Sequence, residues 1–88
     1  MRYHIEFTET AKEHIRKINK EMPSLRPKIE QLIRELTEHP LTGTGKPEKL
    51  RFKLSGHMSR RINVEHRLVY QIDEENQCVL IEALLGHY

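Results

Sequence analysis

The pattern of apolar and polar positions changes from a strand type to a helix type near the start of the chain. Three apolar residues stand at every second position: Tyr3, Ile5 and Phe7. This alternation predicts a short strand. Thr8 or Thr10 can then act as the N-cap of a helix that runs to about Lys20, and Thr10 fits a capping box with Glu13. The helix carries apolar residues at helical spacing: Ala11, Ile15 and Ile18.

A second helix is predicted after Pro23, because proline disfavours helical geometry in the residue before it. Ser24 can cap this helix, and Pro27 falls in its first turn, where a missing N–H is tolerated. Its apolar residues share one face and are interpreted as core: Leu25, Ile29, Leu32, Ile33 and Leu36. His39-Pro40 ends the helix, and turn-forming residues make 41–47 a loop.

Beyond this loop the chain shows strand patterns separated by turns. Four strands are predicted, at 49–54, 58–63, 67–72 and 78–85. The last is nearly continuously apolar, so we expect it to be central in the sheet. The order β-α-α-β-β-β-β favours an α+β fold, with the two N-terminal helices on one face of a twisted, mainly antiparallel sheet. The length predicts a single domain over residues 1–88.

The same alternation predicts which face of the sheet is basic. If the apolar residues of 67–72 face the helices, Arg67 points to the opposite side. In the neighbouring strand Ile62 faces the core, so Arg61 also faces away. The two arginines would share one open sheet face, where we expect a phosphate to bind.

Composition fits a soluble globular protein, with 36% hydrophobic and 32% charged residues. No apolar run approaches the roughly 20 residues that span a bilayer, and the N-terminus has no apolar region of the signal-peptide type. The single cysteine, Cys78, excludes an internal disulfide framework. We therefore expect a cytoplasmic protein that does not contact a membrane.

Charge is distributed unevenly along the chain. The net charge is +2, but Lys46–Arg67 contains seven Lys and Arg and two Glu, which gives this segment +5 and the remainder −3. A basic segment on an otherwise acidic body indicates a polyanion site; the alternative is a solvated surface hairpin. The candidate RNA or phosphate contacts are the basic residues of this segment: Lys46, Lys49, Arg51, Lys53, Arg60 and Arg61.

The sequence lacks the common signatures of phosphate-loop and zinc chemistry. Gly43-Thr44-Gly45-Lys46 is too short for a Walker loop, and the six histidines form no ligand pattern. We expect no metal and no cofactor. The available residue types suit metal-free RNA cleavage, which needs a base for the ribose 2′-OH proton, positive charge on the phosphate and an acid for the leaving 5′-oxygen. The residues alone do not show which side chains meet.

A set of motifs follows in fixed order through the second half of the chain: Gly43-x-Gly45-Lys46-Pro47-Glu48-x-Leu50, Leu54-Ser55-Gly56, Ser59-Arg60-Arg61-Ile62, Glu65-His66-Arg67-Leu68-Val69-Tyr70 and terminal His87-Tyr88. This order and spacing resemble the YoeB family of the RelE/ParE toxin superfamily. The resemblance implies a RelE-like fold. It also implies an endoribonuclease toxin of a type II toxin–antitoxin system, which cuts mRNA in the ribosomal A site without a metal.

The resemblance assigns roles to four residues. Glu48 matches the proposed general base, and Arg67 matches the arginine that stabilises the phosphate transition state. His87 matches the proposed general acid, and Tyr88 matches the tyrosine that positions the substrate. The three residues before His87 depart from the basic or aromatic residues that are frequent in the family, and Gly86 is one of them.

The resemblance also implies partners. Lys46 and Arg61 are similar to supporting contacts with phosphate or ribosomal RNA. A cognate YefM-like antitoxin would fold its acidic-hydrophobic tail on the basic face. The ribosome and mRNA would be the other partners, and a homodimer is possible.

Two other classes of function remain open. One is a non-catalytic binder on the same scaffold, such as a ParE-like gyrase inhibitor or a degenerate toxin. The other is a general RNA-binding module. Neither needs the set of Glu48, Arg67, His87 and Tyr88.

Four further residues are interpreted from their local pattern. Tyr70 and Cys78 are predicted core residues. His66 is interpreted as a turn or core-edge residue. His57 is interpreted as a loop histidine, with a secondary RNA contact as the alternative.

Overall fold

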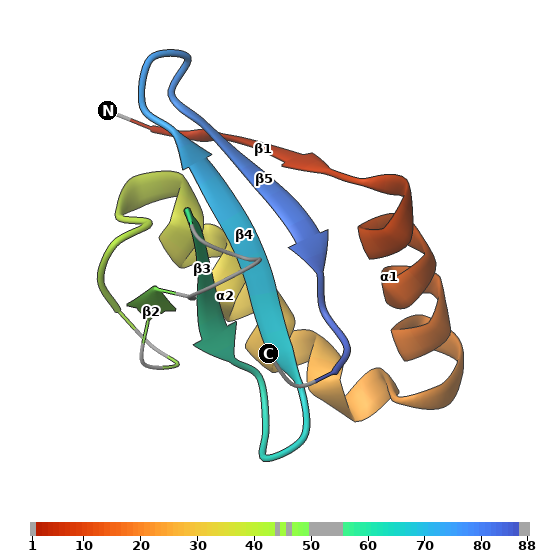
Figure 1. The fold of residues 1–88 in the computed structure, drawn as a ribbon. Coiled ribbons are helices and arrows are strands. Elements are labelled where there is room, and N and C mark those ends of the chain that lie inside the picture. Colours follow the sequence, from red (N-terminus) through yellow and green to blue (C-terminus); the bar gives the residue numbers. More distant parts are fainter. Residues whose placement is uncertain (1, 44, 46, 50–55, 87–88) are drawn as a thin grey trace.

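The computed structural model describes residues 2–43, 45, 47–49 and 56–86, and shows two helices packed on one sheet (Figure 1). The elements follow in this order: β1 (His4–Phe7), α1 (Glu9–Glu21), a 3-10 turn (Pro23–Leu25), α2 (Arg26–Glu38), β2 (Glu48–Lys49), β3 (His57–Arg61), β4 (Arg67–Asp73) and β5 (Cys78–Ala83). The predicted α+β fold is confirmed. Within the described residues, no helix has the length and apolar character needed to cross a membrane.

The sheet has five strands in the order β1-β5-β4-β3-β2. β1 pairs with β5 in parallel, and the other three pairings are antiparallel. The predicted central position of segment 78–85 is wrong, because β4 is the middle strand. β5 is nevertheless an interior strand, because β1 pairs with it on the side opposite β4. It ends at Ala83, and its burial alternates rather than being continuous.

The two helices begin differently. Thr8 is the N-cap of α1: its hydroxyl accepts a hydrogen bond from the Ala11 N–H and donates one to the Glu82 carbonyl, both at 3.0 Å. Of the two predicted caps, the structure therefore selects Thr8, which also joins α1 to β5. The predicted cap at Ser24 is wrong, because Pro23–Leu25 form a 3-10 turn and α2 starts at Arg26 without a side-chain cap.

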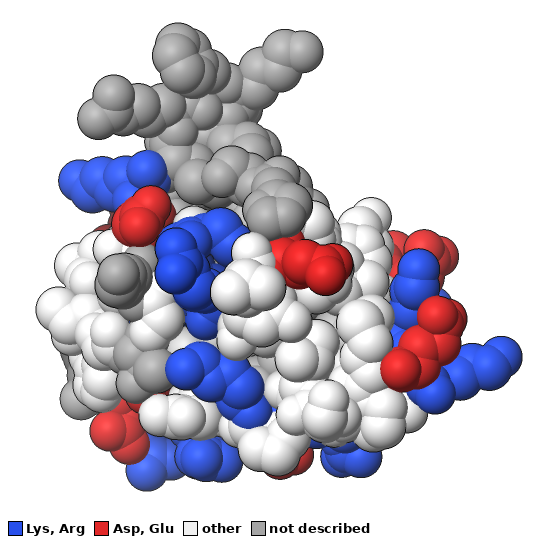
Figure 2. Space-filling model, turned by 90° about the horizontal axis from the view of Figure 1, so that it is seen from below, with Lys and Arg blue, Asp and Glu red and all other residues white. Residues whose placement is uncertain are grey.

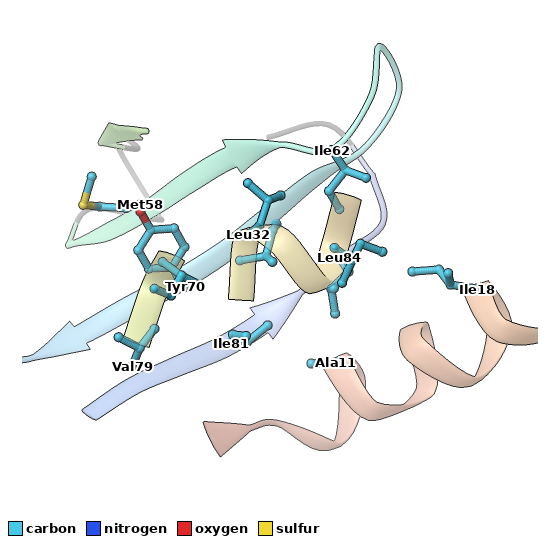
Figure 3. Close-up of a cluster of buried hydrophobic side chains, with 12 residues drawn as sticks. Ala11, Ile18, Leu32, Met58, Ile62, Tyr70, Val79, Ile81 and Leu84 are labelled. Atoms are coloured by element: carbon cyan, nitrogen blue, oxygen red, sulfur yellow. The ribbon is translucent and has the colours of Figure 1, made fainter. Parts of the chain in front are cut away.

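The core lies between the helices and one face of the sheet. Figure 3 shows Leu32 of α2 close to Tyr70 of β4, and Ala11 of α1 beside Ile81 of β5. The core residues with 2% or less exposure come from every layer: Ala11, Ile18, Leu32, Leu36, Leu68, Tyr70, Val79, Ile81 and Leu84. Burying each large apolar side chain contributes about 1.5–3 kcal/mol. The opposite face of the sheet, called the open face below, has neither helix on it (Figure 1).

Candidate active site

Arg67, the first residue of β4, lies on the open face, because its neighbour Leu68 faces the core. Only 12% of its side chain is exposed. Its Nε donates a hydrogen bond of 2.8 Å to the hydroxyl of Ser59 on β3. Its Nη2 is buried and has no hydrogen-bond partner among the described residues. An unpaired buried donor costs free energy, so this nitrogen is prepared to bind an anionic oxygen.

Glu48 reaches the same place from β2. It stands opposite Ser59 in the β2–β3 register, so the two side chains share the open face. Its Oε1 lies 3.8 Å from Nη2 of Arg67, which is an ion-pair distance but too long for a hydrogen bond. The Glu48 side chain is 57% exposed and therefore accessible to a substrate. The structure thus brings the two sequence-predicted residues Glu48 and Arg67 together.

Arg61 completes the basic part of this face. It stands opposite Arg67 in the β3–β4 register, and it is exposed. The prediction that the two arginines share the open face is therefore confirmed. Figure 2 shows Lys and Arg side chains near the centre of the end seen from below, with acidic side chains on either side. The adjacent Arg61 and Arg67 offer two positive charges to a phosphate group.

The glycine motif before Glu48 is fixed to β3. The carbonyl of Gly45 accepts a hydrogen bond of 2.7 Å from the N–H of Arg61. Gly45 has φ +83°, and a Cβ at this position would lie 2.9 Å from the Arg61 carbonyl oxygen. Only glycine fits both the backbone conformation and this close approach. The loop is thereby held against β3 three residues before Glu48.

The chain returns to the same site at its C-terminal end. The N–H of Arg67 donates to the carbonyl of Gly86 at 3.2 Å, and the N–H of Gly86 donates to Nδ1 of His66 at 3.0 Å. Gly86 has φ +109°, a conformation that side-chain-bearing residues rarely adopt. The residue that directly precedes His87 and Tyr88 is therefore bound beside Arg67. His87 and Tyr88 themselves lie outside the described residues.

Arg60 departs from its predicted role as an RNA contact. Its side chain is fully buried. The guanidinium donates to Glu35 Oε1 at 2.9 Å, to the carbonyls of His39 and Thr42, and to the hydroxyl of Tyr70 at 3.2 Å. A guanidinium with all its contacts inside the protein cannot reach a phosphate in solution. Arg60 instead ties β3 to the end of α2.

Of the other basic residues predicted to contact RNA, the structure places none next to Arg67 among those it describes. Lys49 stands opposite Met58, a core residue, so strand alternation directs it away from the open face although it is exposed. Lys46, Arg51 and Lys53 lie outside the described residues. Arg61 is thus the supporting cation that the structure places next to Arg67.

A polar cluster on the open face was missed by the sequence reasoning. Nε2 of His57 on β3 bonds to Oε2 of Glu82 on β5, and Gln71 of β4 donates to the other Glu82 oxygen at 3.2 Å. His57 is thus a strand residue and not a loop histidine. Counting back by twos from Arg61 gives Ser59 and His57, so the alternation could have placed both on this face. Their partners on other strands could not be found in that way.

The chain matches a known protein family over nearly its whole length. The family model described as YoeB-like toxin of bacterial type II toxin-antitoxin system matches residues 6–88. Toxin YoeB of Escherichia coli strain K12 is 48% identical over 61 residues, which cover 69% of this chain and 70% of that protein.

Solved structures agree with this assignment. The YoeB/ParE toxin from Agrobacterium tumefaciens superposes with a TM-score of 0.90 at 30% identity, over 97% of this chain and 99% of that one. The YoeB dimer from Staphylococcus aureus gives 0.87 at 37% identity, over the whole of both chains. The chain belongs to the YoeB family of toxins of type II toxin–antitoxin systems.

Proposed function

We propose that this toxin is a ribosome-dependent endoribonuclease that cuts mRNA in the A site and thereby stops translation. One observation carries the proposal: a nearly buried Arg67, fixed by Ser59, has an Nη2 without a hydrogen-bond partner among the described residues, 3.8 Å from the exposed carboxylate of Glu48. A phosphate-binding donor and a base thus stand next to each other. Since the substrate is mRNA on ribosomes, the site of action is the cytoplasm.

The first half of the reaction uses Glu48 and Arg67. Glu48 accepts the proton of the ribose 2′-OH, and the 2′-oxygen attacks the adjacent phosphorus. Negative charge develops on the non-bridging oxygens, and Arg67 stabilises it through a guanidinium that the Ser59 hydrogen bond already orients. Because Arg67 is fixed before substrate binds, little reorganisation is needed during the reaction.

The second half assigns the acid role to His87. The bond between phosphorus and the 5′-oxygen breaks, and His87 donates a proton to that oxygen, giving a 2′,3′-cyclic phosphate and a 5′-OH. Tyr88 positions the substrate by stacking on a base. The position of Gly86 beside Arg67 supports both assignments, because His87 follows it directly in the chain. Arg61, Lys46, Arg51 and Lys53 supply further contacts to RNA phosphates.

The partners follow from the family. A Staphylococcus aureus relative, with a TM-score of 0.85 and 37% identity over the whole of both chains, is described as a YoeB-YefM complex. Another solved relative is described as a dimer. A YefM-like antitoxin is therefore the proposed inhibitor of this toxin, and self-association into a homodimer is the proposed form without it.

Primer extension on mRNA bound to programmed ribosomes tests the activity. The wild-type toxin should cut at the A-site codon, and free mRNA should stay intact. Glu48→Gln, Arg67→Gln and His87→Gln should each lower the cleavage rate about a hundredfold or more, as loss of a positioned catalytic group does. Arg34→Gln, an exposed change on α2, serves as the control with an unchanged rate.

The double variant Glu48→Gln, His87→Gln decides the mechanism. Cleavage at the wild-type rate by this variant would overturn the assigned roles. Translation arrest by the wild-type toxin with uncut mRNA would overturn the nuclease itself and favour a non-catalytic binder.

A further inference from the structure

Two histidines from distant parts of the chain hold the segment that follows β5. Nδ1 of His14, on α1, accepts a hydrogen bond of 3.0 Å from the N–H of Leu84. Nδ1 of His66, in the β3–β4 connection, accepts one of 3.0 Å from the N–H of Gly86. Because β5 ends at Ala83, this segment no longer has strand pairing along its length. The histidines replace the backbone acceptors that a neighbouring strand would offer.

Both contacts require a neutral imidazole. A ring nitrogen accepts a hydrogen bond only while it carries no proton, so the proton of each ring must sit on Nε2. Protonation turns Nδ1 into a donor that faces another donor, the backbone N–H. Each hydrogen bond is therefore lost when its histidine becomes charged.

The surroundings of the His14 ring favour its neutral state. Burial lowers the pKa of His14, Lys17 and His66 act in the same direction, and Glu13 opposes them. His66 is 18% exposed, and its Nε2 lies 3.7 Å from a carboxylate oxygen of Glu65. The charged or titratable groups facing the pair come from α1, from the β3–β4 connection and from the start of β4: Glu13, Lys17, Glu65 and Arg67.

We propose that His14 and His66 are positioning residues, which hold Leu84–Gly86 beside Arg67, directly before the proposed acid His87 in the chain. This inference rests on the proposed nuclease function, since it gives the two histidines a role through the proposed acid. They touch neither substrate nor reacting atoms. Because the two histidines belong to different elements, they attach Leu84 to α1 and Gly86 to the β3–β4 connection.

The direction of the pH effect follows. For His14 the folded protein binds a proton less readily than the unfolded chain, so its contribution to stability is present above the ordinary histidine pKa and is lost as pH falls below it. The same protonation releases Leu84. Cleavage should therefore decline on the acid side while the rest of the fold persists.

Asn and Phe variants distinguish a role as hydrogen-bond acceptor from a role in filling space, because Asn keeps the acceptor and Phe keeps only the ring. The side-chain oxygen of Asn branches from Cγ as Nδ1 does in His, and it accepts but does not titrate. His66→Asn and His14→Asn should keep the single-turnover cleavage rate within about twofold at neutral pH, whereas His66→Phe and His14→Phe should lower it about tenfold, the loss of one hydrogen bond. His4→Asn and His4→Phe are matched controls on a side chain that is 72% exposed.

The pH profile gives the second readout. Between about pH 5 and pH 8, the acid limb of the wild-type profile should move to lower pH in the double variant His14→Asn, His66→Asn. An unmoved acid limb, or equal rates for the Asn and Phe variants, would overturn the positioning role.

NMR on the purified toxin distinguishes this inference from the proposed function. The amide signals of Leu84 and Gly86 should shift with the titration of His14 and His66 respectively, and the Asn variants should remove each shift. Amides that do not follow the histidines would overturn the inference even if the toxin cuts mRNA. Amides that do follow them in a toxin without nuclease activity would overturn only the proposed function, and with it the catalytic purpose of the pair.

Discussion

At the scale of single residues, Arg60 and Arg61 are neighbours in the chain with opposite surroundings. Arg60 is buried and bonded to a carboxylate, two carbonyls and a hydroxyl. Arg61 is exposed and stands opposite Arg67. Successive side chains of a strand point to opposite faces, so one arginine enters the interior and the other meets the solvent. Arg60 therefore stabilises the fold, and Arg61 is available at the candidate site.

This difference predicts unequal effects on stability. Arg60→Met should lower the free energy of unfolding by about 3–5 kcal/mol, because it removes the buried guanidinium that donates to Glu35 Oε1 and to two carbonyls. Arg61→Met, the matched change one residue later, should alter it by about 0.5 kcal/mol or less. Urea denaturation followed by circular dichroism measures both. Similar losses for the two variants would contradict the structural role of Arg60.

The alternation of strand residues predicted much of the site at this scale. It placed Arg61 and Arg67 on one face, and the same rule, applied one residue earlier, would have placed Arg60 inside. It could not show that Glu35 from α2 meets Arg60, because that contact joins residues 25 apart in sequence. The same rule places Ser59 on the face of Arg67, but it could not show that the two side chains meet across strands.

At the scale of elements, the loop before β2 decides where Glu48 stands. β2 has only two described residues, so its own pairing gives little rigidity. The bond between Arg61 and Gly45 fixes the preceding loop to the end of β3. Because this bond and the pairing with Ser59 both hold the chain at Glu48, its carboxylate stays near Arg67. The glycine motif thus positions Glu48, the proposed base.

A pair of glycine variants tests this placement. Gly45→Ala should cost about 1–3 kcal/mol from its positive φ alone, and the close contact with the Arg61 backbone should move the loop and lower the cleavage rate. Gly56 is the matched control: its φ is +92°, but a Cβ there meets no atom of the described residues within 4 Å. Gly56→Ala should therefore lose stability with little change in cleavage. Equal rates for the two variants would argue against the loop as the support of Glu48.

Most elements were predictable from the sequence, but the pairing of the strands was not. Apolar spacing identified both helices and the strands β1, β3, β4 and β5, because burial of one face imposes a period on the sequence. The strand predicted at 49–54 overlaps β2 only at Lys49, and residues 50–54 lie outside the described residues. The parallel pairing of β1 with β5 joins residues at opposite ends of the chain, such as Ile5 and Val79. No local pattern encodes that partner choice. The position of β4 in the middle of the sheet follows from it.

At the scale of the whole molecule, β4 runs from a basic end to an acidic one. It begins at Arg67, beside Arg61, and ends at Asp73, where Glu74 and Glu75 follow in the turn. A strand of this length spans about 20 Å, more than twice the screening length of about 8 Å at physiological salt. The acidic turn therefore does not neutralise the basic end. If RNA is the substrate as proposed, it is attracted to this end of the strand, which would orient the toxin as it approaches RNA.

This charge arrangement predicts that the proposed binding to ribosomes is sensitive to salt, and that single substitutions change this sensitivity. Each phosphate contact releases a counterion and steepens the fall of affinity with salt. Arg61→Gln should make the slope of log K against log salt shallower by about 0.7–0.9, the contribution of one contact. Lys20→Gln, an exposed change on α1, should leave the slope unchanged. Binding of labelled toxin to programmed ribosomes across a salt series measures the slopes. If Arg61→Gln keeps the wild-type slope, Arg61 does not meet a phosphate, and the open face near Arg67 is not the surface that docks on RNA.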